Sequence, residues 1–358
     1  MGEKFDWGTH RIEGEDVHLA GWGTHPSLEE AQAYCTLIAG SHYENFLIAN
    51  YFTPAEVRQH IENIYAFCRY GDDLGDDAPF DTEGRLTLLN AWQNDLESVA
   101  EGHWSGTAQH PILNAVAATS RACKIPLKPY VDLITAFKLD QNKTQYESWD
   151  ELRDYCVHSA DPVGHLFLYV YGHDDEKLRE ISNFTCTALQ LANHWQDVAR
   201  DLEQNRSYFP TETMTLYGYT QEDYNNRVYD ERWIAMMKHE VDRAQSWFDQ
   251  GKDLWDKVDP HLAVDLRMFT LGGEAILQSI RKLKYNTWKK RPTVSKFKQL
   301  RLFLGARRAW KKAEKAKAKA KQQQSKKLEY KPPPPKLEPW EDPNSPEYDQ
   351  LRVQTNAA

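Results

Sequence analysis

The chain has 358 residues, 41% of them hydrophobic and 27% charged, so it is long enough to bury a core and too apolar for a disordered protein. Residues 1–280 carry 22 Lys and Arg against 46 Asp and Glu, whereas residues 281–358 carry 22 against 7. The net charge of −9 therefore combines an acidic body with a basic end. An acidic body repels phosphate backbones, which excludes nucleic acid as its partner.

The sequence contains no segment typical of membrane crossing or secretion. Apolar runs such as residues 46–49 stop far short of the roughly 20 residues that span a bilayer, and the N-terminus (MGEKFDWGTHRIEGED) is too polar for a secretory signal. The five cysteines are odd in number and lack CxxC spacing, which favours free thiols over a disulfide framework or a zinc site. We therefore expect a cytoplasmic protein.

In chain order, residues 1–30 form a Gly-, His- and charge-rich extension without periodicity. Residues 31–305 then show a helical pattern interrupted by prolines, and alternating strand patterns are hard to find. Ile276, Ile280 and Leu283, for example, follow the i, i+4, i+7 spacing of a helix that packs on a core. We predict a single all-α domain over residues 31–305 and a tail over residues 306–358.

The segment YAFCRYGDDLGDD, residues 65–77, is the first acidic cluster. Five of its side chains fall on or beside one helical face at about 100° per residue: Tyr65, Arg69, Asp72, Asp73 and Asp76. Carboxylates one turn apart repel each other and destabilise an isolated helix. Their juxtaposition suggests a cation between them, and a solvated acidic helix end is the alternative for a single cluster.

The second acidic cluster lies in the predicted helix of residues 184–202, whose other side carries an apolar stripe. Its polar stripe spans about 80° of the helix and consists of Gln190, Asn193, Asp197 and Asp201. Oxygen donors suit hard cations, and Mg²⁺ binds one or two carboxylates together with water and substrate phosphates. Two such faces in one chain indicate a cavity in which Mg²⁺, or Mn²⁺ as its substitute, clamps a diphosphate.

These segments, YAFCRYGDDLGDD and NHWQDVARDLEQNRSYFP, resemble the paired aspartate motifs of the squalene and phytoene synthases. Residues 155–164 (YCVHSADPVG) are similar to the mid-chain segment of that family, and residues 272–292 to its closing helix. The resemblance covers roughly residues 34–305. It implies the all-α isoprenoid synthase fold, a central cavity, and a prenyl diphosphate substrate bound through Mg²⁺.

The resemblance also implies roles for single residues. Those implied to bind metal are Asp72, Asp73, Asp76, Asn193, Asp197 and Asp201. Those implied to bind the diphosphate or the rest of the substrate are Arg69, Arg206, Arg291, His42, Asn45, Gln190, Tyr208, Val163 and Gly164. Tyr65 is expected to face the carbocation, and Phe46, beside the motif, is a further candidate for the cavity wall.

Two departures from the family pattern point to one branch. Residues 42–46 read HYENF where most members carry His-Ser-x-Ser-Phe, and residues 159–164 read SADPVG in place of Ala-Gly-Thr-Val-Gly. Both resemble the hopanoid-associated branch, which converts presqualene diphosphate to hydroxysqualene. The first alternative is a head-to-head prenyl transferase that makes presqualene diphosphate, squalene or phytoene. The second is an inactive member that acts as a membrane-tethered assembly subunit.

The HYENF variant suggests a way to quench a carbocation with water. Tyr43, Glu44 and Asn45 make the subsite bulkier and add a carboxylate that can order water. Glu44 is a candidate to position or deprotonate that water, and a buried partner for Arg69 is an equally good interpretation. No GxGxxG segment offers a nicotinamide site, so no NADPH is expected.

The C-terminal region is basic and then proline-rich. Residues 281–327 contain 19 Lys and Arg against one Glu, and residues 332–358 contain 7 of the 17 prolines. Such runs are commonly solvated or disordered, yet clustered cations also attract anionic lipid headgroups. We therefore expect either a solvated tail or peripheral attachment at the inner face of the cytoplasmic membrane, where partner enzymes of the same pathway would also bind.

Overall fold

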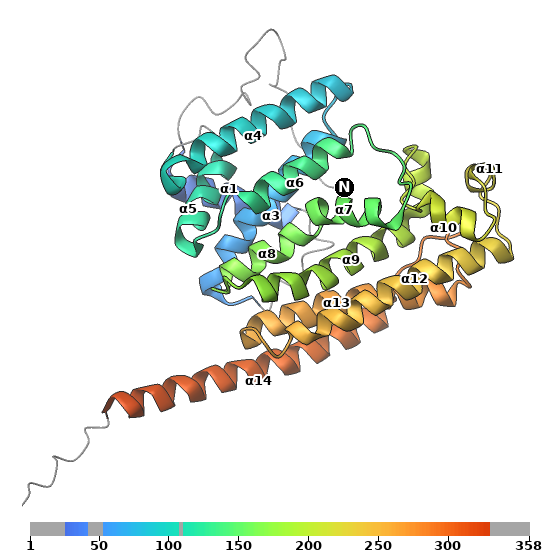
Figure 1. Cartoon of the computed structure of the whole chain (residues 1–358). Helices are drawn as coiled ribbons and strands as arrows, with labels where there is room; N and C mark the ends of the chain where they lie inside the picture. Colours follow the sequence, from blue (N-terminus) through green and yellow to red (C-terminus); the bar gives the residue numbers. More distant parts are fainter. Residues whose placement is uncertain (1–25, 42–52, 107–109, 330–358) are drawn as a thin grey trace, which may run out of the picture. The chain divides into compact units, whose positions relative to one another are not determined.

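The computed structural model describes residues 26–41, 53–106 and 110–329, and every regular element in these ranges is a helix (Figure 1). The helices are α1 (Leu28–Ser41), α3 (Ala55–Asp76), α4 (Thr82–Trp104), α5 (Pro111–Cys123), α6 (Lys128–Leu139), α7 (Trp149–Ser159), α8 (Asp161–Val170), α9 (Glu176–Glu203), α10 (Thr211–Leu216), α11 (Gln221–Asn225), α12 (Glu231–Gly251), η1 (Lys252–Leu254), α13 (Pro260–Lys282) and α14 (Lys296–Glu329). The prediction of an all-α body is confirmed for the described residues.

Prolines mark where several of these helices begin. Pro111, Pro162 and Pro260 lie in the first turn of α5, α8 and α13, where the missing N–H costs no intrahelical hydrogen bond. Because a proline further inside would break a helix, the proline spacing in the sequence already divides the body into its helices.

Helix α9 runs through the core and packs against α7, α8, α12 and α13. Trp195, on the apolar stripe of α9, is fully buried and packs against Phe209 with 4.5 Å between ring centroids. Phe209 in turn packs against Trp233 of α12. This packing uses the apolar stripe of α9 and leaves Asn193 and Asp197 of its polar stripe to line a cavity.

The chain divides into two compact units, Met1–Lys311 and Lys312–Ala358. Helix α14 begins before residue 305, where the sequence predicts the end of the helical domain, and it continues beyond that residue without a break. In the first unit, Ala306 of α14 is buried and packs with Met268 of α13. The basic stretch that follows residue 305 thus contributes to the core before it leaves the first unit.

Two further expectations concern the chain as a whole. Within the described ranges, no helix is both long and apolar enough to cross a membrane. All five cysteines are free, with Cys35 and Cys156 buried. Residues 1–25 and 330–358, which hold most of the predicted extension and all of the proline-rich end, lie outside the described residues.

Candidate active site

A cavity of about 830 Å³ lies between α3, α9, α13 and the segment that follows α13. Its polar lining consists of Asp72, Asn193, Gln196, Asp197, Asp265, Arg291, Thr293 and Gln299. Its apolar lining comes mainly from α13, through Met268, Phe269 and Ile276. The cavity therefore brings together residues from both acidic faces that the sequence predicts.

Helices α9 and α13 run side by side in the same direction along this cavity. A Cβ atom on Gly273 of α13 would lie 3.0 Å from the Leu189 side chain of α9, so the two helices are close at that level. Further along α9, the Gln196 amide donates a 2.7 Å hydrogen bond to the carbonyl of Pro292, which follows α13. Because the two helices are parallel and adjacent, the helical rise along either of them measures distance along the length of the cavity.

The two ends of the cavity lie far apart along these helices. Asp197 is eight residues beyond Leu189, which is about 12 Å at the rise of an α-helix. Asp265 is eight residues before Gly273, again about 12 Å but in the opposite direction. We call the end at Asp265 the floor. We call the other end the mouth, which consists of Asp72, Asn193, Asp197 and Arg291.

Arginines bind the carboxylates of α3 at the mouth. Arg69 donates to Asp72 at 3.2 Å and also pairs with Asp73, which is buried. Arg206, in the segment after α9, donates to Asp76 at 2.9 Å. Arg206 thus connects the segment of the second acidic cluster to the first cluster.

The α9 side of the mouth has the same chemistry. Arg291 binds Asp197 through two hydrogen bonds, from Nε at 2.5 Å and from Nη2 at 2.8 Å, and Arg200 lies 3.7 Å from the same carboxylate. Forked guanidinium–carboxylate pairs of this kind are strong and directional, and the same fork matches a phosphate. The mouth therefore contains groups that can exchange a carboxylate for a phosphate.

A smaller polar pocket of about 380 Å³ adjoins the mouth. It is lined by Arg69, Asp72, Asp76, Asp77, Arg85, Gln204 and Arg206. Asp72 lines both this pocket and the larger cavity. Arginines consequently gather on both sides of Asp72, as a site for a polyanion requires.

Burial and mutual repulsion raise the pKa of two carboxyls near the mouth. Burial, and then the neighbouring Asp76, raise the pKa of Asp72 to about 6. Burial, and then the neighbouring Asp197, raise the pKa of Asp201 to about 7. In both cases burial together with the neighbouring carboxylates outweighs the nearby arginines, so an added cation would be favourable here.

The donor set fits a metal ion only in part. Among the described residues, no group of three or more His, Cys, Asp or Glu side chains is arranged to hold a metal ion. Asp72, Asn193 and Asp197 nevertheless offer oxygen donors to one cavity. Mg²⁺ needs only one or two carboxylates when phosphate and water supply the remaining ligands. The residues present therefore suit Mg²⁺ that is shared with a bound diphosphate.

Other predicted site residues lie around the mouth or in the helix packing. Tyr65 is half-buried against the core, and burial raises its pKa above the ordinary value. Tyr208 stacks on His194, with 3.5 Å between ring centroids. Gln190 is half-buried on α9, one turn before Asn193.

The mid-chain segment has a packing role. Val163 is partly buried against the core, and Gly164 lies where α8 and α9 meet. A Cβ atom on Gly164 would lie 2.3 Å from Ser182 Oγ and 2.6 Å from Cys186 Sγ, so close helix packing explains this glycine. His42, Glu44, Asn45 and Phe46 lie outside the described residues.

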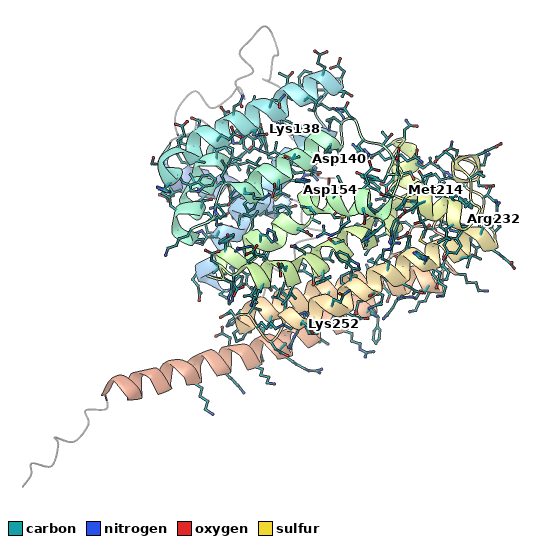
Figure 2. All side chains as sticks on the ribbon, in the orientation of Figure 1. Lys138, Asp140, Asp154, Met214, Arg232 and Lys252 are labelled. Atoms are coloured by element: carbon teal, nitrogen blue, oxygen red, sulfur yellow. The ribbon has the colours of Figure 1, made fainter. Side chains whose placement is uncertain are left out.

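Two acids with raised pKa values near the candidate site carry no motif in the sequence. Asp140, at the end of α6 and labelled in Figure 2, accepts a 3.0 Å hydrogen bond from Tyr155. Burial raises its pKa to about 7, opposed by nearby Arg206. Asp265, on the floor, accepts a 2.9 Å hydrogen bond from the Tyr171 hydroxyl. The only signal for Asp265 is an acid between Val264 and Leu266 on a helix that is otherwise apolar there.

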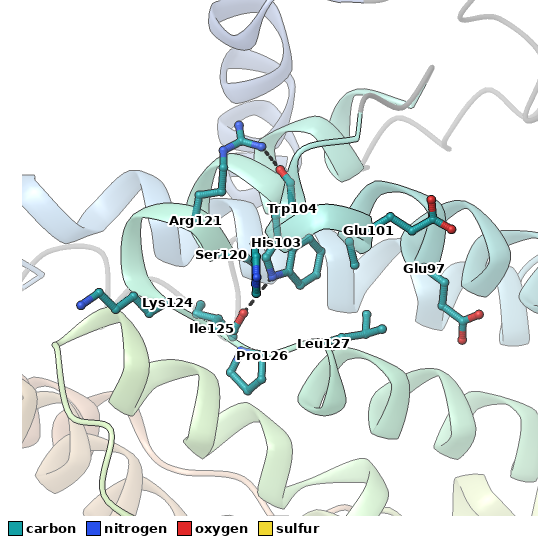
Figure 3. A pocket seen from close by; sticks show the side chains of 11 residues that line it. Glu97, Glu101, His103, Trp104, Ser120, Arg121, Lys124, Ile125, Pro126 and Leu127 are labelled. Atoms are coloured by element: carbon teal, nitrogen blue, oxygen red, sulfur yellow. Dashed lines mark hydrogen bonds between the residues drawn. The ribbon is translucent and has the colours of Figure 1, made fainter.

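A separate cavity of about 560 Å³ lies at the end of α4, against α5 and α6 (Figure 3). Arg121 donates there to the carbonyl of Trp104, and the Trp104 indole donates to the carbonyl of Ile125 at 2.9 Å. These hydrogen bonds join the end of α4 to α5 and to the segment after α5, and they hold the left-handed turn at residues 102–104. They explain this region as a structural connection between helices.

The fold and sequence have close counterparts among known proteins. A model of the squalene/phytoene synthase family matches residues 39–298. The chain is 41% identical to the squalene synthase HpnC of Alicyclobacillus acidocaldarius, whose structure matches with a TM-score of 0.68 over 72% of this chain and 96% of that one. A dehydrosqualene synthase structure matches with a TM-score of 0.69 at 21% identity, over 80% of this chain and 98% of that one. The expected isoprenoid synthase fold is thereby confirmed.

Curated relatives are less similar in sequence. The phytoene synthase of Arthrospira platensis is 26% identical over 74% of this chain and 89% of its own length. The 15-cis-phytoene synthase of Synechocystis is 29% identical over 63% of this chain and 69% of its own length.

Proposed function

The chain belongs to the squalene/phytoene synthase family, and from this premise we propose that it converts presqualene diphosphate and water to hydroxysqualene and diphosphate. It is an enzyme of the squalene/phytoene synthase type. Substrates of such an enzyme contain an ionic diphosphate and a long hydrocarbon chain, so the site must bind both groups.

The observation that carries the proposal is one cavity with an arginine- and carboxylate-lined mouth and an apolar wall. Arg291, together with Arg69 and Arg206 next to it, matches the diphosphate in charge. Met268 and Phe269 match the hydrocarbon. The higher identity to the squalene synthase HpnC than to the phytoene synthases supports the hydroxysqualene branch.

In the proposed reaction the carbon–oxygen bond to diphosphate breaks, and both electrons leave with the diphosphate. The cyclopropylcarbinyl cation rearranges, water forms a new carbon–oxygen bond, and one proton is released. Arg69, Arg206 and Arg291 would bind the departing diphosphate after giving up their present carboxylate partners. The apolar wall would hold the cation away from bulk water until it has rearranged.

Asp72, Asn193 and Asp197 would hold Mg²⁺, or Mn²⁺ in its place, and Asp76 and Asp201 lie beside them. When bound, the metal would neutralise charge on the leaving diphosphate. Asp73 is bound to Arg69 in the protein interior, so we propose that it positions Arg69.

Two other functions are alternatives to this proposal. A head-to-head prenyl transferase is favoured by the phytoene synthases among the relatives. An inactive assembly subunit is disfavoured because the crowded carboxylates of the mouth cost stability that a silent protein need not bear.

Product analysis by mass spectrometry tests the proposal. The purified full chain is incubated with Mg²⁺, without reduced nicotinamide, in ¹⁸O-labelled water, and presqualene diphosphate and farnesyl diphosphate are supplied separately. We expect ¹⁸O-labelled hydroxysqualene from presqualene diphosphate alone. Condensation of farnesyl diphosphate would assign the chain to the head-to-head transferases, and no turnover of either substrate would favour the assembly subunit. Omission of Mg²⁺ should abolish turnover.

Peripheral membrane attachment through the basic segment 281–327 is also part of this proposal. The proposed substrate and product are strongly lipophilic, and the cations of this segment attract anionic headgroups. Partner enzymes that supply presqualene diphosphate or consume hydroxysqualene would then meet the protein at the same surface.

A further inference from the structure

Three large apolar side chains lie exposed along one side of α14. Phe297 is 78% exposed, Leu300 54% and Leu304 40%. Their i, i+3, i+7 spacing places them on one helical face. We call these three residues the apolar ridge. Exposed apolar residues scattered singly need no explanation, whereas an aligned group indicates a binding surface.

The opposite face of the same helix is already used for packing. Ala306 is buried, and Trp310 packs with it against α13. The Trp310 ring also meets His261 edge-on, with 6.2 Å between centroids. These contacts hold the first half of α14 against α13 and leave the apolar ridge exposed on the opposite face.

Positive charge is concentrated in the part of the sequence that contains this ridge. Residues 281–311 contain 12 Lys and Arg and no Asp or Glu, whereas residues 312–358 contain 10 Lys and Arg against 7 Asp and Glu. Lys298 and Arg301 stand directly beside the ridge residues in sequence. Apolar side chains flanked by cations are the pattern of a helix that lies in the surface of an anionic bilayer.

A groove of about 490 Å³ lies between α13 and α14, and the three ridge residues are not part of its lining. Lys298, Arg301, Leu302 and Leu271 line it, and Leu271 is itself exposed. Met268 lines both this groove and the candidate active-site cavity. A hydrocarbon that passes Met268 would therefore enter this groove, whose residues Lys298 and Arg301 are the sequence neighbours of ridge residues.

We propose that the apolar ridge inserts into the surface of an anionic membrane, so that the groove between α13 and α14 connects the active-site cavity with the lipid. The use of the groove rests on the proposed function, because only a lipophilic substrate or product needs such a route. The docking itself rests on the exposed ridge and the surrounding charge. This assigns membrane attachment to the first unit instead of to the tail after Lys311.

Co-sedimentation with vesicles tests the docking, and it requires no substrate. The full chain is compared on vesicles of equal parts phosphatidylglycerol and phosphatidylcholine and on vesicles of phosphatidylcholine alone. We expect binding to the first only. The double variant Leu300→Glu/Leu304→Glu should lower the partition coefficient about tenfold or more, because it removes apolar area and adds charge repelled by the lipid.

Leu37→Glu/Leu216→Glu is the matched control. Both leucines are more exposed than those of the ridge, at 67% and 68%, and they lie on α1 and α10. This control makes the same change in charge, so it should bind vesicles within about twofold of the unaltered chain. Truncation after Lys311 should also preserve binding. Thermal unfolding should show that all variants fold like the unaltered chain.

Several results would overturn the inference. Equal losses in the ridge and control variants would make the effect one of net charge alone. Loss of binding on truncation, with the ridge variant unaffected, would assign docking to the tail. A dimer in size-exclusion chromatography that the ridge variant converts to a monomer, with vesicle binding unchanged, would make the ridge a contact between copies. Hydroxysqualene formation in detergent without vesicle binding would reject the docking and leave the proposed function standing.

Discussion

The mouth and the floor of the cavity both contain aspartates, but their partners differ. At the mouth, Asp197 is held by the guanidinium of Arg291 at 2.5 and 2.8 Å. At the floor, Asp265 is almost fully buried and accepts a 2.9 Å hydrogen bond from Tyr171, while its Oδ1 has no hydrogen-bond partner among the described residues.

The partner decides what each carboxyl can do. A carboxylate that pairs with a guanidinium can exchange that partner for another ion. A carboxyl that is buried beside a phenol is more favourable when neutral, and burial raises the pKa of Asp265 to about 7. The mouth is therefore suited to an ionic headgroup and the floor to a neutral hydrocarbon, although the same residue type is used at both ends.

The largest expected effect lies at the mouth. Asp197→Asn removes the charge that orients Arg291 and that we propose helps to hold Mg²⁺. We expect kcat to fall by about 10³-fold, the size typical of losing one preorganised electrostatic group. Asp253→Asn, at an exposed position of η1, is the matched control and should retain full activity. Steady-state kinetics of both variants measure this, and a loss of less than about tenfold for Asp197→Asn would place it outside the chemistry.

A smaller, pH-dependent effect is expected at the floor. The pKa of Asp265 is raised to about 7 by burial, and secondarily by the charge of Asp259, whereas an unfolded Asp has a pKa of about 3.9. Between these values the folded state binds more protons, so this group lowers stability as pH rises from about 4 to about 7.

Asp265→Asn removes that dependence and keeps an acceptor for the Tyr171 hydroxyl. We expect the variant to gain stability relative to the unaltered chain between pH 5 and pH 8, by about 1–3 kcal/mol. Chemical denaturation at both pH values measures the difference, with Asp253→Asn as the reference. A difference that does not change with pH would mean that Asp265 is ionised in the folded protein throughout.

The smallest expected effect lies on the wall between mouth and floor. A Cβ atom on Gly273 would lie 2.3 Å from Phe248 Cζ, whereas one on Gly272 would meet nothing within 4 Å. Gly273→Ala should therefore destabilise the protein by about 1–2 kcal/mol through overpacking. Gly272→Ala should be neutral or slightly stabilising, because alanine favours a helix over glycine. Equal midpoints in thermal unfolding would show that Phe248 moves aside without cost.

Much of the fold is local in origin and could be predicted. The prolines divide the helices because a proline is tolerated only in the first turn, and the apolar stripe with Trp195 follows from helical periodicity alone. The same periodicity places Asp72 and Asp76 on one face of α3, and Asn193 and Asp197 on one face of α9. The close packing of Gly164 in α8 against Ser182 of α9 has no such local pattern, and the expectation that Gly164 contacts substrate stays a prediction.

The sequence by itself determined the helices, their apolar faces and the two acidic clusters, because each depends on residues within a few turns of one another. Only the tertiary structure decided which charges meet. Arg206 reaches Asp76 across 130 residues, and Arg291 reaches Asp197 across 94. The bond from Tyr171 to Asp265 also spans 94 residues. Such pairs carry no local pattern, since the helix packing that joins them depends on the whole core.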